Sequence, residues 1–363
     1  MTPRLNSHCI AATCATLCTL LYANAHAQSS VTLFGVVDLA VQSVRSDGAG
    51  SATKMASGSS QTGRIGFRGT EDLGGGLSAG FWLEGGLAIN SGIGAANNTN
   101  NQSSGALSAS GLQFDRRSTL SLISASAGEL RIGRDYTPTY WSISKADPFY
   151  ANGLGSDRNL IGAGAISAPT IVRASNSIGY HLPDNLGGIY GQAMYAFGNN
   201  TSNVANSDDG KYFGARLGFA KNGWDVAGAT GSTKYLSGDF QISNLMAAYN
   251  AGFVRVSALL NQSTLKTPVR QKQKDYLLAA SIPWGVGEFK ASYVKSDIST
   301  SPKGAGANLL AFGYLHNLSK RSAAYVHYGR IANTGGATFT NNGLTPVGSG
   351  AAKGIEVGIR HFF

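Results

Sequence analysis

The stretch KYFGARLGF at residues 211–219 alternates two kinds of side chain, one position after the other. One face of the extended chain carries Tyr212, Gly214, Arg216 and Gly218, and the other carries Phe213, Ala215, Leu217 and Phe219. Successive side chains of a β-strand point to opposite faces of the sheet. Water beside Arg216 and lipid beside Phe219 explain both faces at once, which is the pattern of a transmembrane barrel wall.

The same alternation recurs in sixteen segments of about ten residues, separated by turns rich in Gly, Asn, Ser and Asp. These segments are residues 31–44, 61–72, 77–90, 112–124, 128–135, 171–182, 188–198, 211–221, 223–234, 240–250, 253–264, 273–282, 288–299, 307–317, 321–332 and 352–363. No helical period of comparable strength appears. We therefore predict an all-β fold, a 16-stranded antiparallel transmembrane β-barrel.

The connections between these segments alternate in length. Short turns at 183–187, 221–223 and 318–320 alternate with longer loops at 45–60, 91–111, 136–170, 199–210 and 333–351. Short turns on one side and long loops on the other are the polarity of an outer-membrane barrel. An even number of strands returns both ends of the barrel to the side of the short turns, and we expect no separate second domain.

The N-terminal segment has the pattern of a secretory signal peptide. Arg4 precedes an apolar run from Cys9 to Tyr22, and the small residues Ala25 and Ala27 follow it. The apolar run is too short for a transmembrane helix, which needs roughly 20 residues. We predict a cleaved signal peptide at 1–27 and a barrel domain at 28–363. All three cysteines lie within the segment, so disulfides are not expected in the exported chain.

Composition agrees with an exported barrel. Only 13% of the residues are charged, whereas a soluble domain carries about 25%. The formal net charge of +10 is also typical of nucleic-acid-binding proteins, but here the basic residues are scattered singly along strands and not clustered on a helix. The sequence therefore disfavours nucleic acid as a partner.

Motifs for catalysis or metal binding are weak. Residues 76–80, GLSAG, match the G-x-S-x-G pattern of hydrolases, but they form a turn that enters a strand, and the nucleophile needs a strand-to-helix turn. The histidines of the barrel domain fall on separate strands without metal-ligand spacing. We therefore expect no enzyme activity, no metal and no cofactor.

Four stretches resemble the trimeric general porins of Gram-negative bacteria, particularly their β-proteobacterial branch. They are SSVTLFGVVD at 29–38, RIGFRGTEDLGGGL at 64–77, LRIGRDYTPTY followed by DPF within 130–149, and VGIRHFF at 357–363. The resemblance covers nearly the whole predicted barrel domain. Its second and last stretches are the most specific.

The resemblance implies a homotrimer of sixteen-stranded barrels in the outer membrane, surrounded by its lipids. It also implies a third loop, here 136–170, that folds inward and narrows a water-filled channel for passive diffusion of small hydrophilic solutes and ions. A terminal strand that ends in Phe363 resembles the signal read by the barrel-assembly machinery.

The family sets a ladder of arginines on the barrel wall against acidic groups on the third loop. The matching arginines are Arg64, Arg116 and Arg173, and Asp147 is the best loop counterpart, with Asp157 and Asp135 as alternatives. The residues by themselves support two of these arginines, because Arg64 and Arg68 alternate with apolar neighbours and Arg173 begins another alternating segment. The predicted pore constriction comprises Arg64, Arg68, Arg116, Arg173, Asp147 and Asp157.

Arginines at the narrowest point and a basic balance predict a preference for anions. Two alternatives remain open. A ligand-specific channel for anionic metabolites would use the same arginines as a binding site, and a non-conducting outer-membrane adhesin or structural barrel would carry no current.

Overall fold

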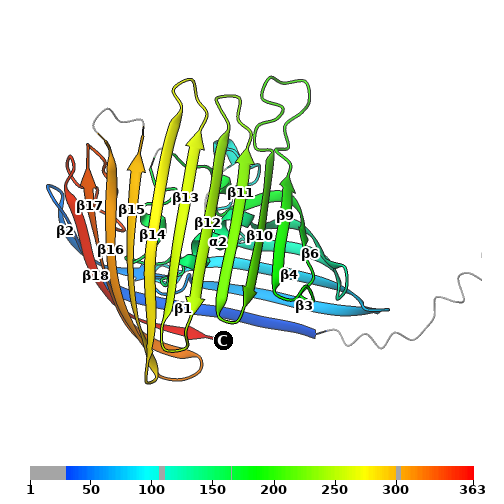
Figure 1. The fold of residues 1–363 in the computed structure, drawn as a ribbon, viewed down its shortest axis with the longest axis horizontal. Helices are drawn as coiled ribbons and strands as arrows, with labels where there is room; N and C mark the ends of the chain where they lie inside the picture. The colour runs from blue at the N-terminus through cyan, green and yellow to red at the C-terminus, as the bar shows by residue number, and fades with distance from the viewer. Residues whose placement is uncertain (1–29, 106–110, 165, 300–303) are drawn as a thin grey trace, which may run out of the picture.

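The computed structural model describes residues 30–105, 111–164, 166–299 and 304–363, which form a barrel closed by pairing of its first and last strands (Figure 1). The strands are β1 (Ser30–Ser46), β2 (Gly50–Ser57), β3 (Arg64–Gly74), β4 (Leu77–Ala88), β5 (Ile93–Gly94), β6 (Arg117–Ser124), β7 (Gly128–Tyr136), β8 (Arg173–His181), β9 (Ile189–Ala196), β10 (Tyr212–Lys221), β11 (Trp224–Thr233), β12 (Phe240–Asn250), β13 (Arg255–Leu265), β14 (Gln271–Trp284), β15 (Gly287–Ile298), β16 (Gly306–Asn317), β17 (Ser322–Thr334) and β18 (Ala351–Phe362). The predicted signal peptide, residues 1–27, lies outside the described residues.

The barrel wall has sixteen antiparallel strands, as predicted. β2 and β3 are two halves of one wall strand, because both pair with the same edge of β1. β5 is a two-residue partner of β4 inside a loop and is not part of the wall. Every other strand pairs antiparallel with neighbours on both sides, so the backbone groups that face lipid are satisfied within the barrel.

The interruption between β2 and β3 corrects one sequence prediction. The loop predicted at 45–60 is wrong, since β1 and β2 form a hairpin with their turn at residues 47–49. The sequence of β2, GSATKMAS, has Met55 (53% exposed) as its single large apolar residue on the outer surface, and one such residue does not mark a strand in lipid. Residues 58–63 then leave the wall, where the carboxylate of Asp38 accepts the backbone N–H groups of Ser60 (3.0 Å) and Gln61 (2.6 Å).

Side chains alternate between lumen and outer surface as the sequence predicted. On β10, Tyr212 and Arg216 are 1% and 7% exposed, while Phe213 and Leu217 are 56% and 61% exposed. The hairpin from β10 to β11 closes with Asn222 and Gly223, both at positive φ, which is the two-residue turn that matches the twist of paired strands. Such short turns gather at one end of the barrel, and the longer loops at the other (Figure 1).

The third loop connects β7 to β8 through residues 137–172 and folds into the lumen (Figure 1). It contains α2 (Pro138–Ala146) and the short 3-10 helices η2 (Asp157–Asn159) and η3 (Pro169–Ile171); a further one, η1 (Ser103–Gly105), lies in the second loop. No helix in the described part of the chain is long and apolar enough to cross a membrane.

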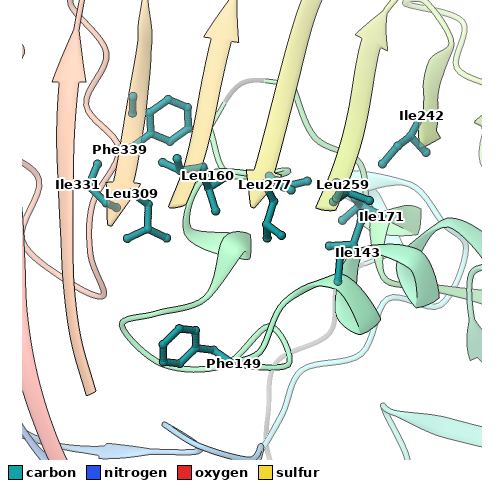
Figure 2. Close-up of a cluster of buried hydrophobic side chains, with 14 of the residues drawn as sticks. Ile143, Phe149, Leu160, Ile171, Ile242, Leu259, Leu277, Leu309, Ile331 and Phe339 are labelled. Atoms are coloured by element: carbon teal, nitrogen blue, oxygen red, sulfur yellow. The ribbon is translucent and has the colours of Figure 1, made fainter. Parts of the chain in front are cut away.

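A hydrophobic cluster fixes the third loop to the inner wall (Figure 2). From the loop it takes Ile143, Phe149, Leu160 and Ile171, and from the strands Leu259, Leu277, Leu309 and Ile331. Burial of each such side chain stabilises the docked loop by about 1.5–3 kcal/mol relative to exposure. The inward fold of the loop therefore has its own apolar core within the barrel.

Candidate functional site

Three arginines enter the lumen at the level of the third loop. Arg64 is the first residue of β3, directly after the break in the wall strand, and Arg173 is the first residue of β8. Arg116 directly precedes β6, and its backbone N–H donates to the carbonyl of Glu84 on β4. We refer to Arg64, Arg116 and Arg173 as the arginine cluster.

Tyr136, at the end of β7, joins two members of this cluster. Its hydroxyl accepts from Nη2 of Arg116 at 2.7 Å and from Nη2 of Arg173 at 3.1 Å. The guanidinium carbon of Arg173 lies 4.6 Å from the centroid of the Tyr136 ring, within the range of a cation–π contact. The tyrosine therefore holds two like charges at the same height in the lumen.

Glu84 supplies the carboxylate of the cluster. It accepts from Nε of Arg116 at 2.5 Å and from Nη1 of Arg64 at 3.5 Å, and the indole N–H of Trp82 donates to it at 3.0 Å. Two guanidinium groups, those of Arg64 and Arg116, thus share one carboxylate. The side chain of Arg64 is 21% exposed and that of Arg116 is 9% exposed, so Arg64 is the more accessible of the two.

Sequence reasoning did not include Glu84 or Tyr136 in the constriction. A signal for Glu84 was present, because the alternation of residues 81–85, FWLEG, puts Trp82 and Glu84 on the lumen face. Tyr136 carried no comparable signal, since it ends its strand and its contacts come from other strands.

Asp147 and Asp157 were expected to face the arginines of the pore, but their side chains lie elsewhere. Both are completely buried within the third loop. Asp147 accepts the backbone N–H groups of Phe149 (2.9 Å), Ala151 (3.0 Å) and Asp157 (3.2 Å), so its carboxylate organises the turn of the loop. Burial raises the pKa of Asp147, and burial together with the neighbouring carboxylate raises the pKa of Asp157 well above its usual range.

Asp135 and Arg68 also lie apart from the arginine cluster. Asp135 pairs with Arg131 at 2.5 Å and with Arg117 at 3.8 Å. Arg68 lies roughly 13 Å further along β3, toward the short turns. Its guanidinium carbon lies 5.2 Å from the ring centroid of Trp82, in a second cavity of about 380 Å³.

A cavity of about 480 Å³ lies between two members of the arginine cluster, Arg64 and Arg116, and the third loop. We call it the constriction cavity. Its wall side includes the charged residues Arg64, Arg116, Arg117 and Glu84 together with aromatic residues such as Tyr136 and Trp82, and its loop side is lined by Tyr140, Trp141, Ser144, Tyr150 and Asn152. The cavity is therefore basic on one side and aromatic and uncharged on the other.

Comparisons with known proteins agree with this architecture. A family model described as Gram-negative porin matches residues 11–336. Outer membrane porin protein 32 of Delftia acidovorans is 38% identical over 362 residues, which cover 93% of this chain and 95% of that protein.

Solved structures give the same assignment. The anion-selective porin from Comamonas acidovorans has a TM-score of 0.80 and 34% identity, over 93% of this chain and 100% of that one. Salmonella typhi OmpF in complex with daunomycin shares the fold, with a TM-score of 0.64 and 18% identity over 92% of this chain and 97% of that one. The chain therefore belongs to the Gram-negative porin family, in its β-proteobacterial branch, and is an outer-membrane porin with a sixteen-stranded barrel.

Proposed function

We propose that this porin passes small hydrophilic solutes and ions by passive diffusion, prefers anions and catalyses no reaction. The observation that carries the proposal is the arginine cluster, in which Arg64 and Arg116 share the carboxylate of Glu84 and Arg173 adds a third guanidinium group against Tyr136. At ~7 Å and an effective dielectric constant of ~20, one unit charge changes the energy of a passing ion by about 2.4 kcal/mol. The anion-selective porin from Comamonas acidovorans, at 34% identity, supports the same preference.

The other parts of the chain take roles that follow from this function. Residues 1–27 act as the cleaved signal peptide and residues 28–363 as one barrel domain, with the third loop as the constriction. Arg64, Arg116 and Arg173 line the narrowest point, and Arg68 extends the basic path beyond it. Phe363 presents the C-terminal strand to the barrel-assembly machinery.

The mature protein forms a homotrimer. This part of the proposal is supported by a difference in side-chain type between two parts of the outer surface of the barrel. The exposed aromatic side chains of the described strands lie on β8 and later strands, and these include Tyr180, Phe213, Trp224, Tyr276 and Phe289. The outer faces of β6 and β7 instead carry exposed aliphatic residues, among them Leu120, Leu122, Leu130 and Ile132. Aromatic residues favour the membrane–water interface. We call the outer surface of β8 and later strands the aromatic wall and that of β6 and β7 the aliphatic wall. The aromatic wall therefore meets lipid, and the aliphatic wall meets the other subunits.

Replacing Arg64 and Arg173 together by Glu tests the anion preference. The double variant reverses two charges at the arginine cluster, so the reversal potential in a salt gradient should move to cation preference, with a several-fold change in permeability ratio. High salt should reduce the effect, because the Debye length is ~3 Å at 1 M. The control reverses two exposed charges on β1 and β17, Arg45→Glu with Arg330→Glu. A reversal potential that stays at its wild-type value in the Arg64 and Arg173 variant contradicts the proposal.

A further inference from the structure

α2 presents two different faces. Thr139, Ser142, Ile143 and Ala146 are buried, and their spacing of three and four residues places them on one side of the helix, against β10–β13. Tyr140, Trp141 and Ser144 lie on the other side and line the constriction cavity. The docking of the helix on the wall therefore turns aromatic rings toward the path of the solute.

These rings form a connected group. Tyr136 and Tyr140 are stacked, with ring centroids 5.3 Å apart and planes at 14°, and the Trp141 ring lies 5.2 Å from that of Tyr136. Tyr150, 50% exposed, lines the same cavity from the turn after α2. Offset stacks and tilted pairs of this kind are the arrangements that aromatic rings prefer.

A cationic group suited to binding a carboxylate, the guanidinium of Arg64, lies across the cavity from these rings. Arg64 donates to Gln61 at 3.1 Å and contacts Glu84 at 3.5 Å, which leaves other N–H donors of its guanidinium for an anion. A guanidinium binds a carboxylate through two parallel hydrogen bonds. The volume of about 480 Å³ falls within the ~300–1,000 Å³ of small-molecule sites.

We propose that the constriction cavity binds aromatic carboxylates in transit, with the carboxylate at Arg64 and the ring against Trp141 and Tyr140. The proposal rests on the proposed anion-preferring channel and names one class of solute for it. A chloride ion or an aliphatic carboxylate meets the same arginines but has no ring to stack. Stacking against these rings should strengthen binding by about two- to tenfold over an aliphatic acid of similar size and equal charge.

Benzoate and cyclohexanecarboxylate are the probes for this site. Both are monoanions at neutral pH and similar in size, but only benzoate has an aromatic ring, and cyclohexanecarboxylate buries at least as much apolar surface. In planar bilayers with the full porin, benzoate should half-block the chloride current at a concentration about two- to tenfold lower than cyclohexanecarboxylate. Trp141→Leu should remove this difference. The control Tyr293→Leu removes an aromatic ring that is 44% exposed on the outer face of β15, and it should leave the difference intact.

The outcomes separate this inference from the proposed function. Equal block by both acids in the wild-type porin overturns the aromatic site, and this comparison needs no variant to fold. A benzoate preference that survives in both Trp141→Leu and Tyr140→Leu also overturns it. The reversal potential in potassium chloride, measured on the same channels without benzoate, tests anion preference alone.

Discussion

Gly35 lies on the outer face of β1, where the C-terminal residue folds back over it. A Cβ added at Gly35 would lie 2.2 Å from Cζ of Phe363 and 2.7 Å from the carbonyl oxygen of Arg64. The backbone N–H of Gly35 also donates to the carbonyl of Phe363 at 3.1 Å, so the first and last strands meet here. A glycine at this position allows the terminal aromatic ring to close the barrel seam.

Gly35→Ala should therefore weaken the closed barrel. The ring of Phe363 is able to move, but the backbone of Arg64 is held in the β1–β3 pairing, and overpacking of this kind costs about 1–3 kcal/mol. Thermal unfolding in detergent, followed by circular dichroism, should show a lower midpoint. Gly228→Ala is the matched control, since a Cβ there meets nothing within 4 Å. Equal midpoints for the two variants would show that the seam has room for a methyl group.

The third loop contains a buried pair of carboxyl groups, Asp147 and Asp157, close to Arg158 and Asp275. Burial and the charge of Asp147 raise the pKa of Asp157 well above its usual range. Because the docked loop holds this proton more tightly than the undocked one, the docked state is favoured at low pH. That contribution is lost as the pH rises from about 4, the ordinary value for Asp, through the raised pKa.

The pH dependence of the third loop should show in the open-channel current. As the pH rises, ionisation of Asp157 beside Asp147 should loosen the loop and increase the current noise of the wild-type channel. Asp157→Asn stays neutral and should make the noise independent of pH over the same range. Asp184→Asn, in an exposed short turn, is the control and should behave as wild type. Noise that rises with pH in Asp157→Asn as steeply as in the wild type would assign the effect to another group.

The whole barrel has an aromatic wall and an aliphatic wall, and the proposed trimer buries the second. Leu120 on β6 is 56% exposed and Leu217 on β10 is 61% exposed in the single chain. The two side chains are thus alike in type and exposure. Leu120 lies on the aliphatic wall, however, and Leu217 lies on the aromatic wall. Only Leu120 would be covered by another subunit.

Leu120→Arg should dissociate the trimer, and Leu217→Arg should not. The first substitution brings three like charges into the proposed interface and removes a leucine whose burial contributes about 1.5–3 kcal/mol per subunit. The second places the same charge at a surface covered by detergent. Light scattering on both purified variants in detergent gives the mass of each. Trimers of equal stability in both variants would move the interface to another part of the wall.

The sequence by itself determined the barrel, because two local rules act on every strand. Side chains alternate with a period of two residues, and every backbone group in lipid needs a partner within the chain. Alternating segments such as 211–219 therefore fixed which residues face water, and Arg64, which the alternation of its own segment predicted to face water, lines the constriction cavity. The half of the second wall strand that β2 forms was not predicted, because β2 has Met55 as its single large outward apolar residue.

Only the tertiary structure decided what faces the arginines. Glu84 reaches Arg116 because β4 pairs with β6 across a long loop, and sequence distance gives no sign of that contact. Asp147 and Asp157 were expected at the pore but are buried, because the backbone N–H groups of the inward turn need acceptors. The aromatic face of α2 meets the pore because Ile143 and its neighbours are buried against the inner wall. Contacts of this kind depend on where distant segments dock, whereas strand alternation depends only on the next residue.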